Sequence, residues 1–355
     1  MQRIVHEPEY KSVHPIFDEI DLFFAETSKK DSNSNRLVKV AFDWSFELLS
    51  FYFKNFGGVD YGFEYDYKDY NQIDPIDNKN IILLFSGGKD SVASILKLQE
   101  QGYNVYLYYM KHINQSFPNE EDISKAIADY LGLPLYIDDI KFSGHHDWME
   151  HPLKNIIIAN GALQYGIREG IGTQIAVGNY RTQELRDESF HMCAGDTIDF
   201  WEAYNDIISH VIPDFSMNIV LENITETLET LEQRRDLLEL AQSCLFPYRW
   251  RGQLIRQNEA KYNIKLMPNR CGSCPKCALE YIYYTDRNIL EFNRDFYVHC
   301  LDVMNRQRNK ENNPVPISTP EELWNDVFPM SMKFENSKLY NELKNGIIKK
   351  DKIKI

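Results

Sequence analysis

The stretch that decides the fold is residues 81–91, IILLFSGGKDS, where an apolar run meets two glycines and then polar residues. Residues 81–85 have the length of a buried strand, and the spacing of apolar residues from Ser91 to about 101 predicts a helix that ends at Gly102. A strand, a glycine turn and a helix in this order can hold an anion, because the free N–H groups of the helix start point at it. We therefore predict a phosphate-binding turn at residues 86–91.

The residue types in the turn fit this chemistry. Gly87 and Gly88 lack a Cβ, so the backbone can come close to a phosphate and adopt positive φ. The hydroxyls of Ser86 and Ser91 add donors, and Asp90 could orient the loop or reach a Mg²⁺ ion that bridges phosphates. A tight turn with no ligand is the alternative, which the agreement of strand, turn and helix disfavours.

The turn is not a Walker A loop. That motif needs glycine at position 83 and serine or threonine at position 90, where this chain has Leu83 and Asp90. Kinase and GTPase functions are therefore disfavoured.

Downstream of the turn the pattern alternates between strands and helices, which predicts a mostly parallel, five-stranded, doubly wound α/β sheet. Further strands are expected at 105–110, 135–140, 174–177 and 217–221. Further helices are expected at 120–131, 155–168, 197–209 and, as one long helix, 225–242. We predict an N-terminal accessory subdomain over residues 1–78, a nucleotide-binding domain over 79–308 and a C-terminal extension over 309–355.

Composition narrows the function classes. The chain has 355 residues, with 39 basic and 53 acidic side chains. This excess of acidic residues disfavours sequence-independent binding of long nucleic acids. It lacks an apolar run of the roughly 20 residues that a membrane span requires, and its first residues do not read as a signal peptide. A cytoplasmic protein without membrane partners is expected.

Four of the six cysteines have the spacing of a metal site. Cys271, Cys274 and Cys277 are separated by two residues each, and Cys244 lies upstream at the end of the predicted long helix. Four thiolates can close a tetrahedral structural zinc site. An iron–sulfur cluster and four buried reduced thiols are the alternatives.

The motif S-G-G-x-D-S after a first strand resembles the PP-loop enzymes, also called N-type ATP pyrophosphatases. The resemblance implies a fold similar to the adenine nucleotide alpha hydrolases and an activity in which ATP adenylates a carboxylate or carbonyl oxygen and pyrophosphate leaves. ATP and Mg²⁺ are the implied cofactors. The implied nucleotide-binding residues are Phe85, Ser86, Gly87, Gly88, Lys89, Asp90, Ser91, Met110, Asn155 and Gly178.

A narrower resemblance is to QueC, the 7-cyano-7-deazaguanine synthase family. It rests on Ser243-Cys244 followed by Cys-Gly-x-Cys-x-x-Cys, and on Pro152-Leu153-Lys154-Asn155, where that family has P-x-R-N. It implies Zn²⁺ at the four cysteines, a catalytic role for Asp90 and Lys154, and substrate contacts from Asn179, Asp187, Ser189 and Asp196. Residues 187–196 lack the family's G-Y-P-D-C-R core, which puts the substrate in doubt.

These resemblances predict ATP-dependent activation of a 7-carboxy-7-deazaguanine-like acid, followed by attack of an amine. Ammonia would give a QueC-like nitrile or amide, whereas a protein amine would give a conjugate, as in a defence-associated relative of QueC that acts against phage. The candidate partners are thus the small acid, a protein acceptor and a second copy of this chain. A tRNA-modifying PP-loop enzyme, either a thiolase or a lysidine-type synthetase, and a non-catalytic nucleotide-binding scaffold are the alternatives.

Overall fold

A computed structural model describes residues 4–7, 71–76, 79–111, 120–142, 154–180, 198–209, 211–221, 224–244 and 248–308. The chain forms two compact units. The first contains residues up to Ser86, 94–115 and 128–222, and the second contains 87–93, 116–127 and the chain from Asn223 on. The predicted boundaries at 78 and 308 adjoin segments outside the described residues and stay predictions.

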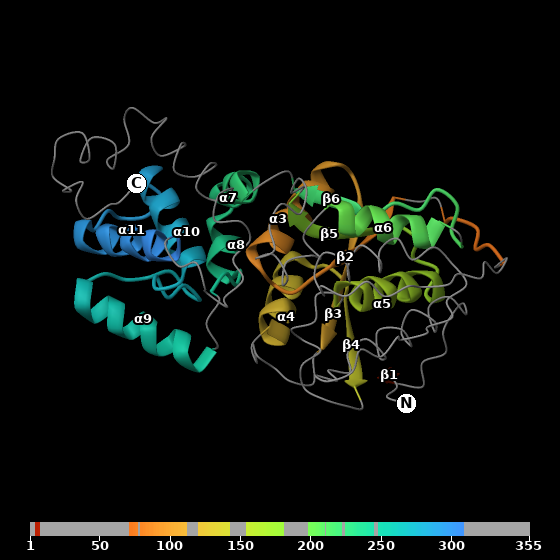
Figure 1. Ribbon diagram of the computed structural model, residues 1–355, viewed down its shortest axis with the longest axis horizontal. Helices are drawn as coiled ribbons and strands as arrows, with labels where there is room; N and C mark the ends of the chain where they lie inside the picture. The colour runs from red at the N-terminus through yellow and green to blue at the C-terminus, as the bar shows by residue number, and fades with distance from the viewer. Residues whose placement is uncertain are drawn as a thin grey trace, which may run out of the picture. The chain divides into compact units, whose positions relative to one another are not determined.

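The first unit is built on a six-stranded sheet (Figure 1), with the strand order β1-β4-β3-β2-β5-β6. Five strands are parallel to one another, as predicted: β2 (Asn80–Leu84), β3 (Asn104–Lys111), β4 (Leu135–Phe142), β5 (Ile175–Tyr180) and β6 (Asn218–Leu221). The sixth, β1 (Ile4–Glu7), pairs antiparallel with β4 and was not expected.

Burial explains why these stretches are strands. Ile81, Ile82 and Leu83 of β2 are completely covered, and β2 lies between β3 and β5. A central parallel strand is covered on both faces, which is why its sequence is continuously apolar rather than alternating.

Helices flank the sheet and confirm the α/β class. α5 (Lys154–Arg168) packs on β2, β3 and β5, and α6 (Ile198–Ser209) runs beside it (Figure 1). The Tyr204 hydroxyl of α6 donates a hydrogen bond of 2.9 Å to Asn160 of α5, in the buried layer between the two helices. α3 (Lys89–Glu100) and α4 (Glu120–Leu131) each begin in the second unit and end in the first.

The second unit is helical. It contains α7 (Ile224–Glu232), α8 (Arg235–Leu240), α9 (Tyr248–Tyr262), α10 (Pro275–Asp286) and α11 (Arg294–Arg308). α10 and α11 share an apolar core that includes Leu279, Ile282 and Phe296. Proline at the first position of α10 is favourable there, because that residue needs no intrahelical N–H partner.

The prediction of one long helix over 225–242 is wrong, because the chain leaves the helical conformation at Arg234, whose φ is −129° and ψ is 65°. An ion pair of 2.7 Å between Arg234 and Asp236 forms at the restart. Ala241, with ψ of 140°, ends the second piece, so Cys244 lies beyond the end of that helix. None of the described helices is long and apolar enough to cross a membrane.

Candidate functional site

Several predicted nucleotide contacts of the first unit lie at one edge of the sheet. Phe85 and Ser86 directly follow β2, Met110 is near the end of β3, and Gly178 is in β5. The strand order reverses at β2, since the chain proceeds from β2 to β3 on one side and returns to β5 on the other. Ligands of open α/β sheets bind at such a switch point, beyond the carboxyl ends of the strands.

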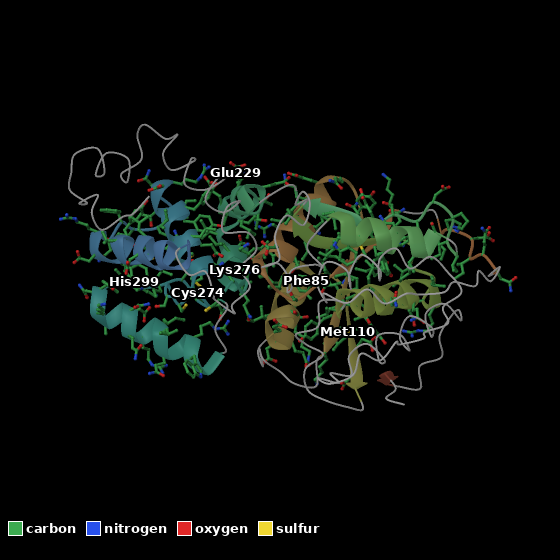
Figure 2. All side chains as sticks on the ribbon, viewed as in Figure 1. Phe85, Met110, Glu229, Cys274, Lys276 and His299 are labelled. Carbon is green, nitrogen blue, oxygen red and sulfur yellow. The ribbon has the colours of Figure 1, made fainter. Side chains whose placement is uncertain are left out.

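Local geometry at this edge is irregular in β5. The pairing of β5 with β6 shifts register between Val177 and Tyr180, which brackets Gly178 and Asn179. Bulges of this kind re-aim side chains and are frequent next to functional sites. Asn155 is half-buried at the start of α5, and Figure 2 marks Phe85 and Met110, both of which are buried.

The glycine turn enters the second unit at Gly87, which has φ of +68°. A Cβ at this position would lie 2.8 Å from the side chain of Ile123 and 3.2 Å from the hydroxyl of Ser124, both on α4. Position 87 therefore requires glycine for its backbone conformation and for the space beside α4.

Lys89, Asp90 and Ser91 form contacts with one another or with the backbone inside the turn. The Lys89 ammonium is almost fully buried and forms an ion pair with Asp90, whose side chain is 26% exposed. The Ser91 hydroxyl donates a 3.0 Å hydrogen bond to the carbonyl of Gly88. Lys89 thus acts inside the turn, and Asp90 is the charged group of the turn that reaches its surface.

Residues 241–244, which we call the strap, pair with the turn. The backbone N–H of Lys89 donates to the carbonyl of Gln242 at 2.9 Å, and the N–H of Gln242 donates to the carbonyl of Gly87 at 2.8 Å. These two bonds form an isolated parallel bridge between the turn and the strap.

A buried ion pair holds the strap on either side of Gln242. The Arg270 guanidinium bonds Glu280 at 2.6 Å, and these side chains are 3% and 0% exposed. Arg270 also donates to the carbonyl of Ala241 at 3.1 Å, while Glu280 accepts a hydrogen bond from the hydroxyl of Ser243. Burial disfavours the charge on Arg270, but the Glu280 carboxylate outweighs it and holds the pKa of Arg270 above its usual value.

The four predicted metal ligands come together at the end of the strap. The sulfur atoms of Cys244, Cys271, Cys274 and Cys277 all lie within 4.8 Å of one another, and all four residues are buried. The sulfur atoms of Cys244 and Cys271 lie 3.3 Å apart. Figure 2 marks Cys274, which precedes the first residue of α10, and Cys277 is in the first turn of that helix.

This donor set fits a tetrahedral thiolate-bound metal. Sulfurs about 2.3 Å from a central zinc would be separated by about 3.8 Å, which agrees with the observed cluster. Burial raises the pKa of the Cys274 and Cys277 thiols well above the ordinary value, so a metal ion that binds there must displace protons. Cys300 is buried on α11 with its sulfur 4.0 Å from the carbonyl of Gly272, outside the cluster.

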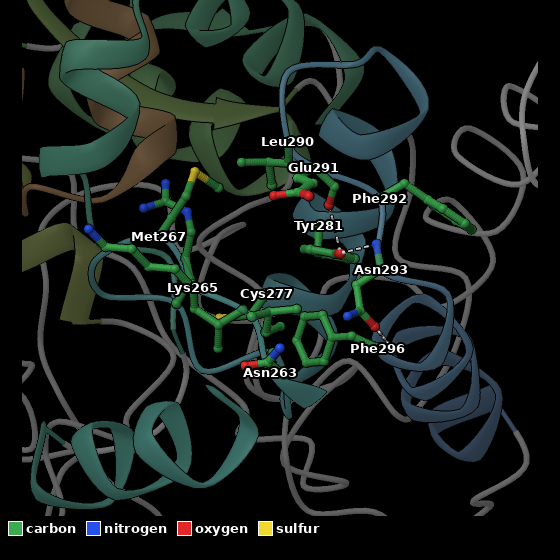
Figure 3. Close-up of a pocket in the computed structure, with 14 residues that line it drawn as sticks. Asn263, Lys265, Met267, Cys277, Tyr281, Leu290, Glu291, Phe292, Asn293 and Phe296 are labelled. Atoms are coloured by element: carbon green, nitrogen blue, oxygen red, sulfur yellow. Dashed lines mark hydrogen bonds between the residues drawn. The ribbon is translucent and has the colours of Figure 1, made fainter. Parts of the chain in front are cut away.

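A cavity of about 260 Å³ opens beside this centre (Figure 3). The loop after α9 and the loop before α11 form its sides, and Tyr281 and Phe296 are among its apolar walls. The Tyr281 hydroxyl donates to the carbonyl of Glu291 at 3.1 Å and accepts from the N–H of Asn293 at 3.2 Å. These polar groups therefore serve the fold of the loop.

No protein-family model matches the sequence. A "tRNA-specific 2-thiouridylase MnmA" from Sulfurimonas denitrificans is 38% identical over 66 residues, covering 18% of this chain and 19% of its own. A "7-cyano-7-deazaguanine synthase 2" from Sulfurisphaera tokodaii is 28% identical over 140 residues, 30% of each chain. A MnmA of Francisella tularensis subsp. novicida is 30% identical over 145 residues, 34% of this chain and 40% of its own.

These similarities support the PP-loop superfamily, and the turn at residues 86–91 is called the PP-loop from here on. The matched segments span less than half the length of each of these relatives. Among solved structures, a predicted subunit of a tRNA methyltransferase from Methanocaldococcus jannaschii overlaps with a TM-score of 0.27 at 18% identity, covering 45% of this chain and 74% of its own. Overlap at that level carries no conclusion.

Some predicted PP-loop site residues fall outside the described part of the chain. Asp187, Ser189 and Asp196 lie between 181 and 197, and only the backbone is described for Lys154 and Asn179. The roles assigned to these residues remain predictions.

Arg270 and Glu280 were missed from the sequence, and so was the bond that Ser243 makes with Glu280. A signal for Glu280 existed, since it is the one charged residue in the apolar run from Cys277 to Tyr284. Charged residues are almost never fully buried unless they are paired, so a buried partner could have been expected.

Replacing Gly87 by alanine should damage the PP-loop specifically. The new Cβ would meet Ile123 and Ser124 of α4, and alanine would be strained at the positive φ of position 87. We therefore expect a loss of roughly 1–3 kcal/mol in stability and at least about tenfold weaker binding of a fluorescent ATP analogue. Gly102→Ala is the matched control, because Gly102 has φ of +83° and the nearest atom to its Cβ is 4.0 Å away. Equal nucleotide affinity in both variants would contradict the steric role of Gly87.

Proposed function

We propose that this protein uses ATP to adenylate an acid, forming AMP and pyrophosphate in the complete reaction. The observation that carries the proposal is the PP-loop itself, in which Gly87 has positive φ, α3 begins two residues later, and Asp90 reaches the surface. The positive end of the α3 dipole favours phosphate at this place. Similarity to the synthase and the thiouridylase supports an ATP-dependent adenylation.

In the proposed reaction a carboxylate oxygen of the substrate attacks the α-phosphorus of ATP. The bond from that phosphorus to the bridging oxygen of pyrophosphate breaks, and pyrophosphate leaves with the electron pair. An amine then attacks the acyl carbon, loses a proton, and AMP departs. Mg²⁺ would neutralise charge on the pyrophosphate, and Asp90 is the described PP-loop residue suited to holding it.

For the acid we propose a 7-carboxy-7-deazaguanine-like compound. The support is the similarity over 140 residues to a 7-cyano-7-deazaguanine synthase together with the four clustered cysteines. We further propose that zinc occupies the cysteine centre in a structural role, because four thiolates leave no open coordination position for a substrate. The proposed contacts of this acid are Asn179, Asp187, Ser189 and Asp196, and Lys154 is proposed as a catalytic residue.

A tRNA-thiolating activity is the second candidate, since seven of the similar proteins carry the name of a tRNA-specific 2-thiouridylase. The chain's formal net charge of −14 weighs against it, because binding to a phosphate backbone draws its free energy largely from basic side chains. The candidates differ in which acceptor stimulates AMP release.

The test is to incubate the metal-loaded protein with ATP and to measure AMP and pyrophosphate with each acceptor. The acids are 7-carboxy-7-deazaguanine and a simple aromatic acid, with ammonia or a protein amine as nucleophile. Unmodified tRNA with a sulfur donor forms the other arm, and mass spectrometry identifies the product. AMP formation that depends on the deazaguanine acid supports the proposal, and stimulation by tRNA alone would replace it with the second candidate. Absence of AMP in every arm would favour a nucleotide-binding scaffold.

A further inference from the structure

We propose that Ser243, Arg270 and Glu280 are positioning residues that transmit the state of the cysteine centre to the PP-loop, so that nucleotide binding requires a filled metal centre. The nucleotide part of this inference rests on the proposed function. The mechanical part, in which the cysteine centre holds the PP-loop in place, is independent of the proposed function. All the residues concerned belong to the second unit.

The first step is the bridge between the strap and the PP-loop. Gln242 uses its backbone N–H and carbonyl to bond Gly87 and Lys89, at 2.8 and 2.9 Å. These are the residues on either side of Gly88 in the turn that would face the phosphates. A shift of Gln242 therefore moves the turn or breaks both bonds.

The second step is the clamp formed by Arg270 and Glu280. It grips the strap at both neighbours of Gln242, through the Ala241 carbonyl and the Ser243 hydroxyl. With side chains 3% and 0% exposed, the pair makes its contacts out of solvent, where each charge depends on the other. Gln242 is thus held from both sides by a single rigid pair.

The third step joins the clamp to the metal ligands. Arg270 directly precedes Cys271, Glu280 lies one helical turn after Cys277 on α10, and Cys244 is the last residue of the strap. The two clamp residues and the strap are therefore each attached to a cysteine of the cluster. A bound metal ties these segments together, and its loss removes their common attachment.

The experiment compares three serine variants of the metal-loaded full chain. Ser243→Ala removes one contact of the clamp, and Ser243→Thr keeps the hydroxyl. Ser273→Ala is the matched control, because the Ser273 hydroxyl also lies in the cysteine region but accepts a hydrogen bond from Asn258, at 2.9 Å. Metal content, amide hydrogen exchange in peptides that contain residues 87–93 and 241–244, and affinity for an ATP analogue are measured for each.

We expect Ser243→Ala to retain its metal, to exchange the amides of Lys89 and Gln242 about tenfold faster, and to bind the ATP analogue about tenfold more weakly. Ser243→Thr should restore both values, and Ser273→Ala should match the unsubstituted chain. Unchanged exchange at Lys89 and Gln242 in Ser243→Ala would overturn the proposal. A change of the same size in Ser273→Ala would also overturn it, since the effect would then be general.

Removal of the metal by a chelator provides the second measurement. Faster exchange at 87–93 while α11 stays protected supports the coupling, whereas unchanged exchange at 87–93 after complete metal loss refutes it. If the unsubstituted chain fails to bind the ATP analogue but the exchange of Lys89 still depends on Ser243 and on metal, the proposed function fails and the mechanical coupling stands.

Discussion

Asp90→Asn is expected to lower the rate of AMP formation by roughly 10²- to 10³-fold, the size of effect seen when one group that stabilises transition-state charge is removed. Asp90 is in the first turn of α3, and its side chain is partly exposed beside the PP-loop. A carboxylate next to phosphates is unfavourable unless a cation lies between them, so its loss should weaken Mg²⁺ binding. Single-turnover measurement of AMP at saturating ATP, with Mg²⁺ varied, tests this.

The buried charge of Lys89 makes a control variant necessary for that experiment. Its ammonium is almost completely buried and forms an ion pair with Asp90, so Asp90→Asn removes a compensating charge and can reduce stability on its own. The double variant Lys89→Met with Asp90→Asn removes both charges together. If the double variant is stable and lacks activity while Lys89→Met alone keeps it, the carboxylate is needed for the reaction. Wild-type turnover in either variant that carries Asp90→Asn would refute the role of Asp90.

Cys274→Ser is expected to release the metal ion and to destabilise the chain by at least about 3 kcal/mol, because binding energy at a closed thiolate site is folding energy. A loss of this size should lower the melting temperature of a 355-residue chain by roughly 4 °C. Cys274 is buried among the three other sulfurs and precedes α10, so the start of that helix loses its attachment as well. Metal analysis and thermal unfolding measure the two effects.

Cys300→Ala is the matched control for the cysteine centre. Cys300 is as deeply buried as the four clustered cysteines but lies outside their cluster, on α11. We expect it to keep one metal ion per chain and to lose only the packing of one sulfur atom. The zinc assignment fails if Cys274→Ser keeps its metal and its melting temperature, or if Cys300→Ala loses both equally.

The local sequence was sufficient to predict the structure where a single physical requirement explains the residue type at a position. The continuous apolar run of β2, the glycine at 87 and the cysteine spacing each led to a correct structural prediction, because burial, positive φ and metal ligation leave few alternatives. The helix over 225–242 failed for the opposite reason. Neither glycine nor proline marks its interruption at Arg234, and the glutamine and arginine side chains there favour a helix.

The strap and the clamp could not be predicted for a different physical reason. Gln242 contacts the PP-loop through its backbone, so its side chain type carries no trace of the contact. Ser243 and Glu280 are 37 residues apart in the chain, and only the folded second unit brings them together. Clusters of like residues are visible in a sequence, whereas bonds between unlike residues at long range are not.

The strand β1 has a practical consequence for work with shortened chains. Ile4–Glu7 pairs with residues 139–142 and so occupies the outer side of β4. An uncovered strand edge offers its backbone groups to other chains and promotes aggregation. A truncated protein that begins at Lys79, which keeps the whole PP-loop, would expose that edge. Poor solubility of such a fragment would then be expected from the uncovered edge of β4, and would not by itself indicate a defect in the nucleotide site.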